Sequence, residues 1–318
     1  MHLMAFGGRQ RSKRLQKNIA QLEQDFLWYS RDCSQHFGVF AEKDINFKLQ
    51  VAKFRQRLFF RCGLFWLSHC ILLSCVNYPL ISDILNLRDR FLTVFSFQLI
   101  QAKYAEYCST ILIVKEFVGA LQQSLLLLRF EIIRHQPPCP GKVGKHFPFY
   151  GKLMANQFLL SRVWFLVQYI EDYFGLPMLI LFLYNGVAIT HTINWMYVRS
   201  FALDDKDSLE GYRFYFILLV FIGMFWACWL TQECTDKYNQ LSSILGSFKI
   251  HATDVALKNR QREYSLQLLH QKLDFSCWGF FDMNLKYFGL MALAVTTYVF
   301  ILIQFKLQAE TEKGNLRL

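Results

Sequence analysis

The side chains that could carry chemistry in this chain lie inside its apolar stretches, above all in the last one. Residues 287–305 contain a single amide side chain, Gln304, among mainly aliphatic and aromatic residues. A polar side chain in an apolar helix is costly unless it reaches water, the membrane interface or a partner helix. At about 100° per residue, Thr297, Ile301, Gln304 and Phe305 fall on one face of such a helix. This face is the first candidate site.

Two interpretations of this face remain open from the residues alone. Several copies of the helix around an axis would form a narrow pore, with Ile301 and Leu302 at a hydrophobic gate and Gln304 and Phe305 at its outer end. Alternatively, Gln304 only reaches the outer membrane boundary, and Tyr298 anchors the helix at the interface.

Two charged residues, Lys103 and Glu106, lie inside another apolar stretch. Unpaired charges in a membrane cost several kcal/mol. The spacing of three residues places both side chains on one helix face, where they could neutralise each other. We predict that they pair with each other or face a water-filled cavity.

Other polar and aromatic residues could line a ligand pocket in the outer halves of the apolar stretches. Each of them is more often a packing or interface residue than a ligand contact. Together with Lys103 and Glu106, the candidates are Asn77, Tyr78, Gln98, Asn185, His191, Asn194, Trp195, Tyr215 and Phe216.

The motifs of catalysis and metal binding are missing from the sequence. It has neither a Gly-x-Ser-x-Gly motif nor a complete phosphate-binding loop. The nine cysteines form no Cys-x-x-Cys pair, and no two of them fall in an external loop. We therefore expect no enzyme, metal, cofactor or structural disulfide.

The composition indicates a helical membrane protein. Hydrophobic residues make up 53% of the 318 residues, charged residues only 19%, and mean hydropathy is +0.19. A soluble chain carries about 25% charged residues. We predict an all-α integral membrane protein, a helical bundle with five transmembrane spans and cytosolic helical extensions. The predicted spans are 62–81, a stretch beginning near Phe91, 174–198, 214–230 and 287–305.

Positive charge sets the predicted orientation. Segments 1–57, 115–173 and 232–280 hold 24 Lys and Arg residues, whereas the short opposite connections and the tail hold eight. Because basic residues gather on the cytosolic side, the N-terminus is predicted inside and the C-terminus outside. This distribution accounts for the net charge of +11, so nucleic acid is not an expected partner. The predicted segments are 1–57 (cytosolic helix), 58–114 (two spans), 115–173 (cytosolic helices and a Pro/Gly linker), 174–231 (two spans), 232–283 (cytosolic anchor), 284–305 (last span) and 306–318 (extracellular tail).

The last span resembles the C-terminal signature of insect gustatory receptors. It reads Thr297-Tyr298, five apolar residues, then Gln304-Phe305, and residues 275–284 (FSCWGFFDMN) resemble the family's approach to its last helix. The resemblance implies a tetrameric ligand-gated cation channel whose last helix lines the pore. It further implies a small-molecule tastant, a homo- or hetero-tetramer held by a cytosolic anchor, and the plasma membrane of gustatory neurons (dendrite, axon and cell body).

The sequence departs from the family in its number of spans. The family has seven, and five are predicted here, because segment 1–57 resembles the connection between the family's second and third spans. The family's ligand pocket includes those early helices, so the departure bears on agonist binding more than on channel assembly. Two other functions stay open: a non-conducting partner of complete receptors, and a G-protein-coupled receptor, which the five spans and the external C-terminus oppose.

Overall fold

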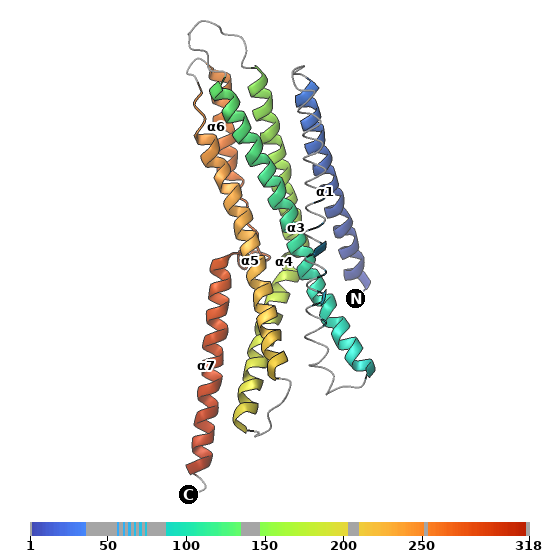
Figure 1. Cartoon of the computed structure of the whole chain (residues 1–318), viewed down its shortest axis with the longest axis vertical. Helices are drawn as coiled ribbons and strands as arrows, with labels where there is room; N and C mark the ends of the chain where they lie inside the picture. Colours follow the sequence, from blue (N-terminus) through green and yellow to red (C-terminus); the bar gives the residue numbers. More distant parts are fainter. Residues whose placement is uncertain are drawn as a thin grey trace. The chain divides into compact units, whose positions relative to one another are not determined.

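The computed structural model describes residues 2–35, 87–134, 147–202, 210–250 and 254–315, with scattered positions between 56 and 74. Regular structure in these residues is helical, apart from one isolated antiparallel bridge between Ser276 and Asp282. The predicted all-α fold class is therefore confirmed. The helices in Figure 1 are α1 (His2–Gln35), α3 (Leu87–Arg134), α4 (Phe147–Ala202), α5 (Glu210–Gly246), α6 (Val255–His270) and α7 (Leu285–Asn315).

Three of these helices are much longer than a membrane is thick. α3 has 48 residues, α4 has 56 and α5 has 37. At 1.5 Å per residue they measure roughly 72, 84 and 56 Å, against a hydrocarbon core of roughly 30 Å. Each must therefore extend well beyond a bilayer that it crosses. The described stretches long and apolar enough to cross are Ala102–Arg134, Phe149–Tyr197, Arg213–Gly246 and Leu285–Ala309.

Three of the five predicted spans lie within α4, α5 and α7. The predicted stretch near Phe91 begins inside α3, and most of the predicted span 62–81 lies outside the described residues. α4 joins the last part of the predicted cytosolic segment 115–173 to the predicted span 174–198 without a break, and it includes Pro177. One continuous helix thus includes both segments.

The chain divides into two compact units, and the first comprises residues 1–61, 109–174 and 232–275. Its core combines aliphatic side chains, such as the fully buried Leu121 and Leu153, with the buried aromatic rings of Tyr238 and Tyr264. α1 is attached to the long helices by polar and aromatic contacts: the Arg162 guanidinium donates twice to Asp25, at 3.0 and 3.1 Å, and the Phe26 and Phe117 rings lie 5.1 Å apart. The ion pairs of this unit include Lys115–Glu233, Lys237–Glu233, Lys152–Glu131, Arg162–Asp25 and Arg260–Glu263.

The second unit comprises residues 62–108, 175–231 and 276–318. Its helices contain long stretches without Asp, Glu, Lys or Arg, namely 173–198 of α4, 214–232 of α5 and 287–305 of α7. Large apolar side chains on these stretches are exposed, so the unit has a surface that suits lipid rather than water. The most exposed are Val187, Phe305, Leu293, Phe300, Leu183, Tyr215, Phe214, Leu290 and Ile180.

Candidate functional site

The candidate pore helix, α7, has two distinct sides. Partly covered residues recur at 288, 291, 295, 299, 302 and 306, which is the spacing of one helix face. On this face the Phe288 ring packs against Phe221 and Phe225 of α5, and the Lys306 ammonium lies 5.5 Å from the Tyr197 ring. Figure 1 shows α7 at the edge of its unit, next to α4 and α5, and none of its apolar stretch is fully buried.

The opposite side of α7 carries an uncovered stripe, defined here as Leu290, Leu293, Thr297, Ile301 and Gln304. Leu290, Leu293 and Ile301 are 57%, 62% and 40% exposed. The Thr297 hydroxyl donates to the Leu293 carbonyl at 2.9 Å, so this polar group is satisfied within the helix. The stripe is apolar with polar positions at 297 and 304.

The structure separates the predicted gate residues. Ile301 and Gln304 lie on the uncovered stripe, and Phe305, 68% exposed, lies at its edge. Leu302 is half-buried on the other side of the helix, with 295 and 299. Tyr298 is 55% exposed and lies between the two sides. The fold therefore brings together three of the four predicted gate residues.

The lead-in segment to α7, residues 271–284, begins with a set of side-chain hydrogen bonds to its backbone. Three consecutive carbonyls, those of residues 271–273, each accept a hydrogen bond from a side chain of α4 or α5. The donors are Tyr238 to Gln271 at 2.5 Å, Trp164 to Lys272 at 3.1 Å and Thr235 to Leu273 at 3.2 Å. We call this arrangement the carbonyl clamp. It satisfies backbone groups that have left the α6 helix, and it fixes where the lead-in segment starts.

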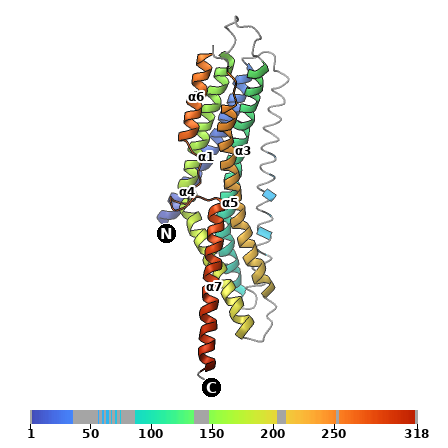
Figure 2. The same ribbon diagram turned by 90° about the vertical axis from the view of Figure 1, so that its left-hand side faces the viewer.

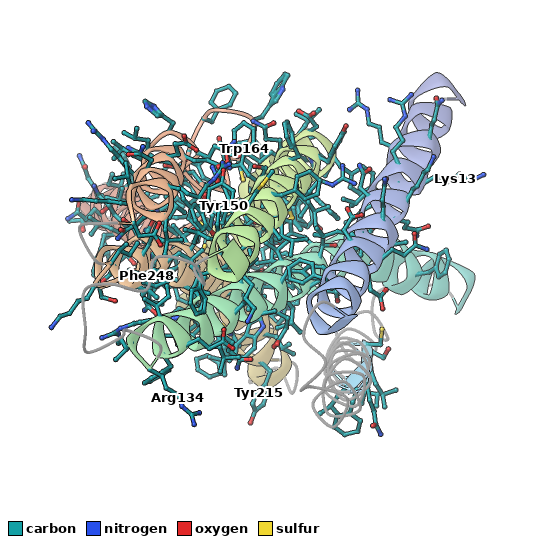
Figure 3. The ribbon with its side chains drawn as sticks, turned by 90° about the horizontal axis from the view of Figure 1, so that it is seen from above. Lys13, Arg134, Tyr150, Trp164, Tyr215 and Phe248 are labelled. Atoms are coloured by element: carbon teal, nitrogen blue, oxygen red, sulfur yellow. The ribbon has the colours of Figure 1, made fainter. Side chains whose placement is uncertain are left out.

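The helix before the clamp, α6, is attached to α4 by a polar seam. The buried Tyr264 hydroxyl donates to the Asn156 side chain at 2.6 Å, and Asn156 in turn donates to the Leu121 carbonyl at 3.4 Å. Gln157 donates to Gln267 at 2.8 Å. Figure 3 labels two further residues of α4 that take part in this contact, Tyr150 and Trp164. The Tyr150 hydroxyl accepts a hydrogen bond from Arg260 of α6 at 2.6 Å, and Trp164 donates to Lys272, just after α6 ends.

The lead-in segment then folds into an aromatic turn, residues 276–282. The Cys277 amide donates to the Phe281 carbonyl at 2.8 Å, and the Phe280 amide donates to the Cys277 carbonyl at 3.1 Å. Trp278 has φ 54°, a left-handed conformation that costs a bulky residue about 1–3 kcal/mol. The turn lies directly on α4, because a Cβ atom at Gly175 would be 3.0 Å from the Trp278 nitrogen. Only glycine leaves that space.

Stacked aromatic rings hold the start of α7 against the turn. The Phe281 and Tyr287 rings are parallel, with centroids 3.5 Å apart, and the Phe182 ring of α4 lies 6.1 Å from each. Figure 2 shows α7 starting beside α4 and α5 of this unit. The first turn of the candidate pore helix is thus fixed, whereas the stripe beyond it is uncovered.

Among the described residues, the predicted ligand-pocket candidates lie on α3, α4 and α5, and those on α4 do not share one helix face. Lys103 and Glu106 form an ion pair at 2.7 Å, which confirms the predicted pairing. Asn185 is buried, and about 100° per residue places it opposite the half-buried Asn194 on α4. His191, Trp195 and Tyr215 are exposed, and Phe216 is half-buried. The remaining candidates, Asn77, Tyr78 and the side chain of Gln98, lie outside the described residues.

Sequence reasoning did not find the carbonyl clamp, the polar seam or the aromatic turn. One local signal was available: Tyr150, Gln157, Ser161 and Trp164 recur at helical spacing on one face of α4. That polar and aromatic face predicts a partner, but nothing in the chain says that the partner is α6, more than 100 residues away.

The chain matches known chemosensory receptors. Residues 1–309 match the family described as 7tm Chemosensory receptor. The Drosophila melanogaster protein "Putative gustatory receptor 98b" is 34% identical over 303 residues, which is 92% of this chain and 69% of that protein. "Putative gustatory receptor 98c" of the same species is 34% identical over 223 residues, 69% of this chain and 53% of that protein. The chain thus spans about two thirds and about half of these two relatives.

The fold is similar to solved structures of the insect olfactory receptor OR5 from Machilis hrabei. One gives a TM-score of 0.57 at 12% identity, covering 92% of this chain and 81% of that one. The structure in complex with eugenol gives 0.55 at 12% identity, covering 81% and 68%. The resemblance expected from Thr297-Tyr298 and Gln304-Phe305 is therefore confirmed over nearly the whole chain. This membrane protein belongs to the 7tm chemosensory receptor family, among the insect gustatory receptors.

Proposed function

We propose that this chain is a subunit of a ligand-gated, non-selective cation channel that responds to a small-molecule tastant. The observation that carries the proposal is the uncovered stripe of α7. A helix packed on one side and open on the other needs a second surface for the open side. Further copies of α7, from identical or related chains, supply that surface.

The polar positions of the stripe favour a water-filled axis over lipid. Gln304 on a lipid-facing side would leave an amide in hydrocarbon, which is costly. Around a central axis, four copies of Gln304 would form a polar ring, and four copies of Ile301 one turn away would form an apolar constriction. Phe305 at the edge of the stripe would flank the ring. We assign Leu302 to packing within the subunit.

The ion pairs of the first unit support the orientation that basic residues predict. Charged and hydrogen-bonded side chains gather in residues 109–174 and 232–275, and these residues would form the cytosolic helices and anchor. The N-terminus is then cytosolic and the C-terminus extracellular, in the plasma membrane of a gustatory neuron. The tastant would enter from the outer halves of the spans, where Asn185, Asn194 and Trp195 lie.

The test is cysteine accessibility in a conducting receptor. Gln304→Cys and the matched control Leu302→Cys are expressed in cells, and currents are evoked with caffeine, sucrose or dissolved carbon dioxide. A cationic thiol reagent is then applied from outside, with the parent chain measuring reaction at native cysteines. We expect Gln304→Cys to be modified at least tenfold faster than Leu302→Cys. Equal rates, or faster reaction at position 302, would overturn the pore face.

The alternative function is that of a non-conducting partner of complete receptors, in which the uncovered stripe of α7 would pack against a longer receptor. Expression alone and together with a longer gustatory receptor distinguishes the two functions. Current from this chain alone supports the channel subunit; silence alone, with larger currents in the mixture than from the longer receptor by itself, supports the partner. An epitope at the C-terminus, stained on intact cells, tests the orientation.

A further inference from the structure

Two aromatic side chains project from the aromatic turn, residues 276–282. Trp278 is 65% exposed and Phe280 is 71% exposed, although Cys277 between Ser276 and Trp278 is buried. Their rings lie 6.2 Å apart, so they form one continuous apolar tip. Large exposed aromatic rings in a turn indicate a surface that contacts something other than water.

The backbone of the turn holds both rings in place. The Ser276 hydroxyl accepts from the Gly279 amide at 2.8 Å, and the Cys277 amide is bonded across the turn to Phe281. Beneath the turn, the Trp278 backbone lies against Gly175, which fixes the position of the turn on α4. The aromatic tip is therefore built to project and does not depend on a flexible loop.

The position of the turn along the chain places it at a membrane boundary. Directly after it, α7 begins at Leu285, and its charge-free stretch starts at residue 287. Gly175, which touches the turn, is three residues after Asp172, the last charged residue before the charge-free part of α4. Two independent helices thus change from charged to apolar at the level of the turn.

We propose that the aromatic turn inserts Trp278 and Phe280 into the headgroup–acyl boundary of the bilayer, at the side where α7 enters the membrane. Tryptophan favours this depth because its ring is apolar and its N–H remains in reach of headgroups. The exposed Lys286 lies next to the turn, where its ammonium can reach lipid phosphates. The insertion sets the depth of the start of α7. This inference rests on the membrane placement of the chain and does not require that the chain conducts ions.

The test is photocrosslinking in the intact receptor, reconstituted in nanodiscs of phosphatidylcholine and phosphatidylserine. The photoreactive amino acid p-benzoylphenylalanine replaces Trp278 in one variant and Leu269 in the matched control. Leu269 of α6 is also 65% exposed, but it belongs to the charged first unit. Each variant is irradiated, and intact mass spectrometry measures the fraction of chains that carry one lipid.

We expect at least fivefold more lipid adduct at position 278 than at position 269. A chain-to-chain crosslink as the main product at position 278 would overturn the proposal and assign the tip to a second subunit. Adduct at position 278 no greater than at position 269 would also overturn it, since the tip would then face water.

A second measurement keeps the test valid if the crosslinker variant fails to fold. Quenching of tryptophan fluorescence by brominated phosphatidylcholine is compared between the parent chain and Trp278→Phe, which keeps an aromatic ring in the turn. Loss of part of the quenchable emission in Trp278→Phe supports insertion. An unchanged quenchable emission places Trp278 outside the bilayer and contradicts it.

Discussion

Gly175 of α4 lies so close to Trp278 that a Cβ atom at position 175 would be 3.0 Å from the Trp278 backbone nitrogen and 3.5 Å from its Cα. The contact joins residues that are 103 positions apart in sequence (278 − 175). Both of these Trp278 atoms belong to the backbone, so they cannot move aside as the end of a flexible side chain would. The aromatic turn can adopt its position only because this residue of α4 lacks a side chain.

Gly175→Ala is therefore predicted to destabilise the protein, although alanine is the better helix former by about 1 kcal/mol. The methyl group would push the turn away from α4, and the melting temperature of the purified receptor should fall. Gly186→Ala on the same helix is the matched control, because nothing lies within 4 Å of a Cβ there. Its melting temperature should stay level or rise. A rise in both variants would contradict the close contact.

Tyr238→Phe is predicted to loosen the carbonyl clamp by removing one donor, the hydroxyl that bonds to the Gln271 carbonyl. A buried hydrogen bond of this kind contributes about 1 kcal/mol, and the orphaned carbonyl adds to the cost. Amide hydrogen exchange of residues 271–275 should become several-fold faster. Exchange in α1, which supplies no donor or acceptor of the clamp, serves as the internal reference. Unchanged exchange at 271–275 would mean that the other two donors suffice.

Tyr264→Phe is predicted to cost more than an ordinary surface substitution because it leaves the Asn156 oxygen buried without its donor. The expected loss is about 1–3 kcal/mol in the free energy of unfolding. The double variant Tyr264→Phe with Asn156→Leu removes both polar partners and should recover part of this loss. Thermal unfolding followed by gel filtration measures both variants. A double variant less stable than the sum of the singles would argue against a direct hydrogen bond.

Arg162→Lys is predicted to detach α1 partially from the first unit. The guanidinium donates to Asp25 through both Nε and Nη2, and a lysine can replace only one of these bonds. The pair is about one-third exposed on both sides, so the expected loss is small, about 1 kcal/mol. Limited proteolysis should cut residues 10–26 about fivefold faster. Lys17→Arg, an exposed change on α1, should leave the rate unchanged.

Local features of this fold were predictable from sequence, and distant ones were not. The Lys103–Glu106 pair follows from a spacing of three residues on a helix, and the helical class follows from composition and apolar length. The clamp joins Trp164 to Lys272 across 108 residues, and no local pattern carries that information. The uncovered stripe was predictable only in part. The spacing of Thr297, Ile301 and Gln304 indicates their shared helix face, but only the structure shows that Leu302 is half-buried on the other side.

At Trp278, the residue that best stabilises the left-handed backbone of the turn differs from the residue that best places the turn in the membrane. Glycine adopts φ 54° without strain, so Trp278→Gly should relieve about 1–3 kcal/mol in the turn itself. The same change removes the ring that we assign to the lipid boundary. A variant selected only for resistance to heat in detergent would then be expected to carry glycine here, whereas one selected for correct depth in a bilayer would keep tryptophan. Screens in micelles should therefore favour glycine at position 278, and screens in cells should favour tryptophan.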